Sequence, residues 1–160
     1  MPVRLTDAEI AALLAEIKQL PADWQARFAT RVKAGHRERD VEVVGADGSE
    51  FVVNVRQSLA NPLDFSVILA HRPPKSGNYF RLRRYNGLSH EHSNPIEREK
   101  FLGYHIHQAT ERYQEPGCFR EDHFAVQTGA YATIEDALGC MLRDCGFTAP
   151  GGIFWQGSLF

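Results

Sequence analysis

The apolar positions in residues 1–35 recur with the spacing of helices. Intervals of three and four residues separate the first apolar group, which consists of Ile10, Leu13, Leu14 and Ile17. The segment 6–9 before it, Thr-Asp-Ala-Glu, has the sequence of a capping box, which satisfies the first free N–H groups of a helix. Pro21 ends this helix and permits a second one over residues 22–32. The buried side of the second helix would carry Trp24, Phe28 and Val32.

Over residues 40–128 the period changes to two, which predicts strands. Apolar and polar side chains alternate there, and turn-forming Gly, Pro and Asn residues separate the runs. The expected strands are residues 41–44, 51–56, 65–71, 79–85, 103–110 and 123–128. The polar segment 86–103 between the fourth and fifth strands is expected to be a loop with a helical turn over 96–101.

A last helix is expected over residues 133–146, because Thr133 can cap it and Gly146 can end it. The apolar tail 147–160 is suited to docking on a partner or on a second copy of the chain, as in a homodimer. These elements predict one α+β domain with a mainly antiparallel sheet of five to six strands. N-terminal helices and a C-terminal helix would flank the sheet.

Composition excludes several classes of protein. The chain of 160 residues is 43% hydrophobic and contains no apolar run of membrane-spanning length. Its three cysteines form no CxxC pair, which favours reduced thiols and a cytoplasmic location. The net charge of −2 gives no overall attraction to nucleic acid. Residues 66–90 nevertheless lack acidic side chains and carry several basic ones, which suits either a phosphate backbone or a solvated strand face.

Histidines are concentrated in one short stretch. Four of the seven lie within 18 residues, in the segments His90-Glu91-His92 and His105-Ile106-His107. Because side chains alternate along a strand, His105 and His107 should project from the same face. Such a pair could contact one phosphate, bind one metal ion or form a half-exposed polar face.

Arg84 strengthens the case for a functional site. In an alternating strand it shares the apolar face of Phe80 and Leu82, where a guanidinium needs a partner. Glu111 would be a structural partner, and a substrate phosphate would be a functional one. The residues expected to bind substrate around it are Tyr85, Asn86, Asn94, Arg81, Arg83 and Tyr113.

Three functions are compatible with these residues. In metal-independent RNA cleavage, His105 and His107 would be the acid–base pair, Arg84 would stabilise the charge on phosphorus, and His92 would add a further imidazole. In a metal site, zinc, nickel or iron would be bound by a set drawn from His90, His92, Glu97, His105 and His107. In a non-catalytic binding module, the polar loop would recognise a protein or a nucleotide.

Two family motifs bear on this choice. The pattern Gly87-x2-His90-x-His92-x4-Glu97-x5-Gly103 resembles the first metal motif of the cupins, although the glycine spacing differs and no second motif follows. Residues 80–113 resemble the TumE-type toxins of bacterial toxin–antitoxin modules. The matching segments are Arg84-Tyr85-Asn86, His92-Ser93-Asn94-Pro95 and His105-Ile106-His107. The second resemblance implies a cytoplasmic endoribonuclease that acts on RNA and is restrained by an antitoxin protein.

Overall fold

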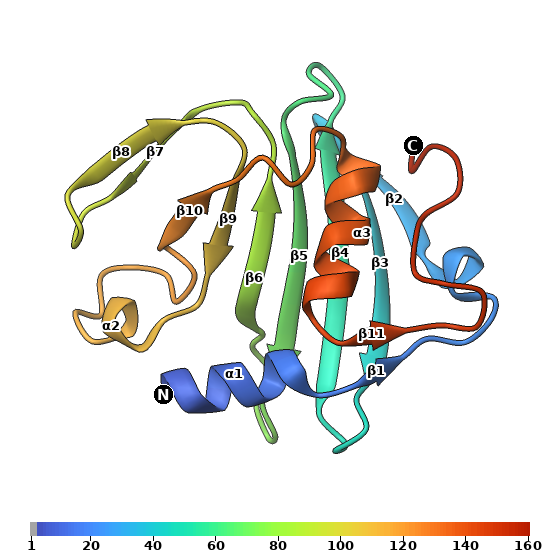
Figure 1. The fold of residues 1–160 in the computed structure, drawn as a ribbon, viewed down its shortest axis with the longest axis horizontal. Coiled ribbons are helices and arrows are strands. Elements are labelled where there is room, and N and C mark those ends of the chain that lie inside the picture. The colour runs from blue at the N-terminus through green and yellow to red at the C-terminus, as the bar shows by residue number, and fades with distance from the viewer. Residues whose placement is uncertain (1–2) are drawn as a thin grey trace.

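The computed structural model describes residues 3–160 and contains a seven-stranded antiparallel sheet (Figure 1). The strands lie in the order β10-β9-β6-β5-β4-β3-β2. Their bounds are β2 (Ala29–Lys33), β3 (His36–Val44), β4 (Glu50–Ser58), β5 (Phe65–Arg72), β6 (Phe80–Asn86), β9 (His105–Gln108) and β10 (Ala125–Gln127). The predicted α+β class and antiparallel sheet are confirmed.

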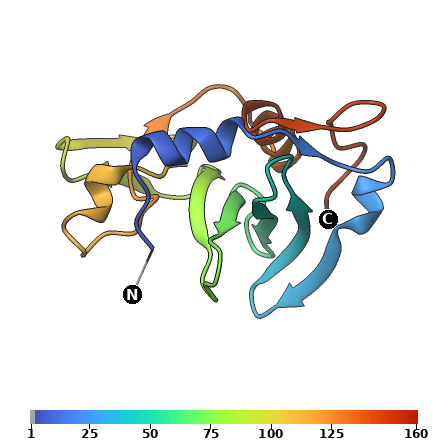
Figure 2. The same cartoon turned by 90° about the horizontal axis from the view of Figure 1, so that it is seen from below.

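One face of the sheet is covered by helices (Figure 2). Helix α1 (Asp7–Ala15) and helix α3 (Ile134–Asp144) lie on this face, together with a small parallel pair of strands, β1 (Lys18–Gln19) and β11 (Phe147–Thr148). The capping box forms at Thr6 as the sequence predicts, and Thr133 caps α3. No helix in residues 3–160 is long and apolar enough to span a membrane.

The hydrophobic core lies between the sheet and α3. Alternate residues of the central strands point toward the helix and are nearly inaccessible to solvent, as the period of two predicts. They include Phe51, Val53, Val55, Val67, Leu69 and Leu82. Leu138, Met141 and Leu142 supply the matching apolar stripe of α3. This packing fixes the position of β6, which is the strand next to β9.

A buried lysine joins the ends of the two helices. Lys18 is inaccessible to solvent, and its Nζ donates hydrogen bonds to the carbonyl oxygens of Leu13, Glu16 and Cys145 at 2.7–2.8 Å. These carbonyls lie at or just beyond the C-terminal ends of α1 and α3, where a positive charge is favourable. Burial lowers the pKa of Lys18 to about 8, so the side chain is still charged at neutral pH.

Two predicted helical segments are wrong. In residues 22–32 the structure has only a short 3-10 helix (Trp24–Arg27), and the chain continues as β2. Trp24 and Phe28 are buried as expected, but Val32 is 70% exposed because it lies on the edge strand of the sheet. β-branched residues fit such a strand better than a helix, and the helical spacing of these three residues was misleading.

The predicted loop with a helical turn at 96–101 is instead a hairpin. Strand β7 (Glu91–Asn94) pairs with β8 (Glu99–Leu102), and Arg98 adopts a positive φ of 58° in the connecting turn. The hairpin extends from the sheet beside β9, and a short helix, α2 (Glu111–Gln114), lies beyond it. The hairpin gives His92 a strand position instead of a loop position.

A β-bulge changes the face on which Arg84 lies. Leu69 of β5 pairs with Arg83, whereas the next residue, Ala70, pairs with Arg81, so Leu82 is an extra residue in β6. The extra residue reverses the alternation beyond it. Arg84 therefore projects from the face opposite α3, and its predicted place beside Phe80 and Leu82 is wrong. Regular alternation in the sequence gives no sign of this irregularity.

Candidate metal centre

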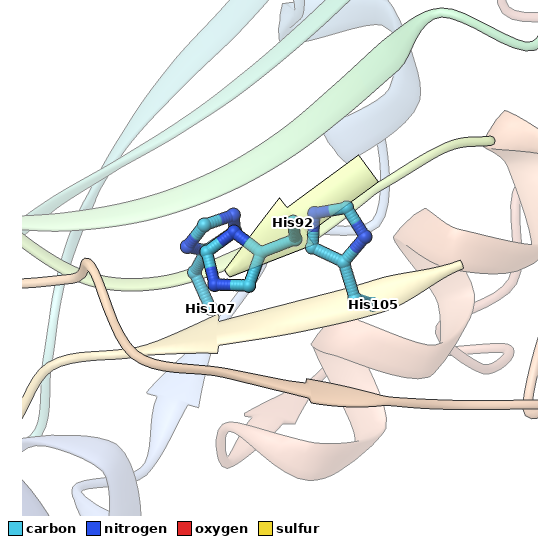
Figure 3. Close-up of side chains that lie close together, drawn as sticks. All are labelled: His92, His105 and His107. Carbon is cyan, nitrogen blue, oxygen red and sulfur yellow. The ribbon is translucent and has the colours of Figure 1, made fainter. Parts of the chain in front are cut away.

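His92, His105 and His107 converge on the face of the sheet opposite α3 (Figure 3). One ring nitrogen from each lies within 4.8 Å of those of the other two. The ring centroids are 4.8 Å apart for His92 and His107, 5.0 Å for His105 and His107, and 5.2 Å for His92 and His105. All three side chains are buried. His105 and His107 therefore lie on the same face of β9, as expected, and His92 of the hairpin joins them.

The neighbouring strands hold the three rings in place. His107 lies between Arg84 of β6 and Ala125 of β10 in the sheet register. The hairpin is attached to β10 by Asn94, whose Nδ2 donates to the carbonyl of Ala125 at 2.8 Å. The N–H of Ala125 donates back to Asn94 Oδ1 at 3.0 Å. These two bonds place β7, and with it His92, above the histidines of β9.

Hydrogen bonds also determine which nitrogen of each ring carries the proton. The Nδ1–H of His105 donates to the carbonyl of Gly103 and the Nδ1–H of His107 to that of Asp122, both at 2.8 Å, because a carbonyl oxygen can only accept. The orientation of the Asn94 amide is set by Ala125, so its Oδ1 is an acceptor too. The Nε2–H of His92 donates to that oxygen at 2.8 Å.

The opposite nitrogen of each ring is left with a free lone pair. These atoms are Nδ1 of His92 and Nε2 of His105 and of His107, and Nε2 of His105 is buried without a hydrogen-bond partner. A buried acceptor without a donor costs free energy. In histidines that bind metals, the N–H on the other side of the ring is commonly held by an oxygen atom in the same way. The three rings are therefore candidate ligands for a metal ion.

Burial and nearby positive charge keep all three imidazoles neutral. Burial lowers the pKa of His92 below its ordinary value, that of His105 to about 4 and that of His107 to about 2. The Arg84 guanidinium lowers the pKa of His107 further. Neutral imidazole is the form that binds metal ions. An imidazole with so low a pKa is a weak base at neutral pH, so these rings are better suited to binding a metal ion than to taking up a proton.

A buried carboxylate lies beside the histidines. Asp122 is inaccessible to solvent, and its carboxylate lies 3.2 Å from Nε of Arg84, 3.4 Å from Nε of Arg120 and 3.7 Å from Nε of Arg81. The partner of Arg84 is thus Asp122 and not Glu111, which corrects the expectation from the sequence. Asp122 was not predicted as a site residue, because nothing in its loop sequence distinguishes it from a solvated acid.

The histidines open onto a pocket of about 290 Å³. Two members of the cluster, His92 and His107, line it, whereas His105 is fully buried and is not part of the lining. The remaining lining residues are mostly polar or charged: Asp64, Phe65, Ser66, Arg84, Asn86, Ser89, His90, Arg120 and His123. A metal ion bound to the three rings would therefore be accessible from a hollow of small-molecule size.

The comparisons with known proteins give no family. No family model, no curated protein and no solved structure matches the chain. The interpretation of the site therefore rests on its geometry, and no residue role is transferred from another protein.

Several predicted site residues lie away from this centre. Tyr85 is buried under α3 and donates a hydrogen bond to Asp144 Oδ2 at 2.7 Å, and Arg83 lies 3.5 Å from the same tyrosine hydroxyl. Both are on the far face of the sheet because of the bulge. Tyr113 is also buried, and its hydroxyl donates to Glu97 Oε1 at 2.6 Å. The ion pair of Glu97 with Arg112 completes this separate group.

The proposed metal ligands from the sequence are only partly brought together. The His90 ring lies 5.8 Å from that of His105 and contacts Ser89 Oγ, so it lines the pocket without joining the cluster. Glu97 is bound to Arg112 and Tyr113 as described. Asn94 holds the hairpin and orients His92, and Asn86 lines the pocket.

The basic residues of segment 66–90 do not form one continuous stripe. Arg72 pairs with Glu50 and Arg81 pairs with Glu121, whereas Arg83 lies under α3. Arg84 is the member of this set that lines the pocket. An extended phosphate backbone would therefore meet paired arginines along these strands.

Proposed function

We propose that this protein is a metal-dependent enzyme in which His92, His105 and His107 bind one divalent ion. The observation that supports the proposal is the set of three buried imidazoles with one ring nitrogen of each within 4.8 Å of the others, each ring also held by a hydrogen bond to an oxygen atom. Three imidazoles without a carboxylate favour zinc, and after it iron or nickel, over magnesium or calcium.

The site has the character of a catalytic centre and not of a structural one. Structural zinc sites are closed by four protein ligands, whereas catalytic sites have three and an open position. Here the three ligands border a pocket through His92 and His107. A divalent ion in such a place supplies a Lewis acid and lowers the pKa of a bound water, which suits hydrolysis.

A metal titration tests this proposal. The purified chain is dialysed against a chelator, and zinc, nickel, cobalt and magnesium are then added separately during calorimetry. We expect one equivalent of zinc per chain and no magnesium binding, because the ligands are nitrogen atoms only. Absence of zinc binding, or equal binding of magnesium, would show that the cluster is not this kind of centre.

Metal-independent RNA cleavage is a second candidate, favoured by the presence of Arg84 and His107 in one pocket. His107 would accept a proton from the ribose 2′-hydroxyl, for which its pKa of about 2 makes it a weak base, and His90 or His123 would supply the proton for the leaving oxygen. An antitoxin would be the partner of such an activity. Incubation of RNA with the protein and a chelator separates the candidates, since only the second predicts undiminished cleavage.

Asn94 offers a test of the metal site that leaves the ligands unchanged. Asn94→Ala removes the acceptor of the His92 N–H, and we expect zinc affinity to fall about 10- to 100-fold. Ser93→Ala, at the neighbouring position on β7, is the control and should bind zinc like the wild type. Competition with a chromophoric chelator measures both, and circular dichroism confirms that the variants are folded. Unchanged affinity in folded Asn94→Ala would argue against His92 as a ligand.

A further inference from the structure

The pocket beside the three histidines would have an excess of positive charge once a divalent ion is bound. Its three guanidinium groups, of Arg81, Arg84 and Arg120, are already balanced by three carboxylates, of Asp64, Glu121 and Asp122. Three neutral imidazoles would leave both charges of a bound divalent ion uncompensated. The loaded pocket would thus attract an anion, and one with more than a single negative charge would balance it best.

Two of these arginines are placed to touch such an anion. Arg84 and Arg120 line the same pocket as His92 and His107. Asp122 lies closest to the Nε atom of each guanidinium. The ion pair of Arg84 with Asp122 is made from Nε at 3.2 Å, and 84% of the Arg84 side chain is shielded from solvent. The rest of the planar guanidinium offers further N–H donors for a ligand oxygen.

We propose, on the basis of the metal function above, that the pocket binds the phosphoryl group of a small phosphate ester. One phosphoryl oxygen would lie on the metal ion and the others on Arg84 and Arg120, because the planar guanidinium matches phosphate oxygens in pairs. A phosphate monoester is a dianion near neutral pH, so it balances the positive charge of the metal-loaded pocket better than a monocarboxylate does.

The surroundings of the pocket fit the organic part of such an ester. Ser66, Asn86 and Ser89 offer hydroxyl and amide groups along the wall. A second hollow of about 220 Å³ adjoins it and shares Asp64, Phe65 and Ser66. Arg56 and His36 also line the second hollow. The two hollows together suit a polar molecule of sugar or nucleotide size.

The test uses phenylphosphonate, which carries the phosphoryl dianion and cannot be hydrolysed, and benzoate as the monocarboxylate of similar shape. Each is titrated calorimetrically into the zinc-loaded protein. We expect phenylphosphonate to bind at least about tenfold more tightly than benzoate. Arg120→Ala should weaken phenylphosphonate binding to the zinc-loaded protein about tenfold, because one charge-assisted contact is lost. Asp122 keeps Arg84 and Arg81 in this variant.

Two further variants make the result specific. Arg27→Ala removes an exposed arginine paired with Asp23, away from the pocket lining, and should bind phenylphosphonate like the wild type. Arg120→Lys keeps the charge but lacks the planar fork, and its affinity should lie between those of wild type and Arg120→Ala. If Arg120→Ala does not fold, the affinity of Arg120→Lys for phenylphosphonate is compared with that of the wild type instead.

The outcomes distinguish this inference from the proposed function. If zinc binds but phenylphosphonate affinity is the same in wild type and Arg120→Ala, or equals that of benzoate, the phosphate site is wrong and the metal centre stands. If zinc does not bind, the metal function is wrong. In that case phenylphosphonate is titrated into the metal-free protein. Binding that is weakened in Arg120→Ala would support a phosphate site made by the arginines alone. No binding of phenylphosphonate would show that the phosphate site is wrong too.

Discussion

Replacing His107 by alanine is expected to lower the affinity for zinc by about 100-fold or more. Zinc in a four-ligand structural site contributes about 10–16 kcal/mol, so one ligand accounts for roughly 3 kcal/mol, or about two orders of magnitude. His107 is the best member of the cluster to remove. It lies between β6 and β10, and its far N–H is held by the carbonyl of Asp122. Competition with a chelator of known affinity gives the value.

Thermal unfolding separates loss of a ligand from general damage to the fold. An ion that binds only the native state raises the melting temperature, so zinc should stabilise the wild type and not His107→Ala. His36→Ala is the matched control, because His36 is a partly buried strand histidine that pairs with Glu38 outside the cluster. This control should keep the full response to zinc. Equal stabilisation of His107→Ala by zinc would contradict the assignment.

Replacing Lys18 by methionine is expected to lower the free energy of unfolding by about 3–5 kcal/mol. The buried ammonium donates to four carbonyl oxygens, those of Leu13, Leu14, Glu16 and Cys145. Methionine has a similar length but donates no hydrogen bond, so these carbonyls would remain buried without it. The C-terminal ends of α1 and α3 would also lose the positive charge that their dipoles favour. Urea unfolding followed by circular dichroism measures the loss.

Lys100→Met is the control for this substitution. Lys100 is exposed on β8, and its replacement should change the free energy of unfolding by less than about 0.5 kcal/mol. If Lys18→Met were as stable as Lys100→Met, the hydrogen bonds from Lys18 Nζ would not stabilise the contact between α1 and α3. A moderate loss of 1 kcal/mol or less would likewise contradict the expected magnitude.

The sequence predicted the part of the site that depends on regular alternation. His105 and His107 share a face because the period of a strand is two residues, and the neighbouring Ile106 is paired with Tyr85 on the other face. His92 was identified as a candidate but assigned to a loop. The strand at 91–94 is only four residues long and carries no apolar alternation that would have revealed it.

The part that was missed depends on irregular backbone and on distant contacts. The extra residue in β6 changes the face of Arg84 and Tyr85, and a bulge has no reliable signature in one sequence. The role of Asp122 could not be predicted, because it depends on the contact that its loop makes with β6 and β9 in the folded chain. Lys18 was overlooked for a similar reason, because one of its carbonyl partners comes from residue 145.

Asp122 makes the two halves of the pocket mutually dependent. Its backbone carbonyl fixes the His107 ring, and its carboxylate is shared by Arg84 and Arg120. A ligand that draws those arginines away from the carboxylate also acts on the peptide that aligns the histidine. Occupancy of one half should therefore change the affinity of the other, and thermodynamic reciprocity requires the same factor in both directions. One residue thus gives this small site the means for cooperativity.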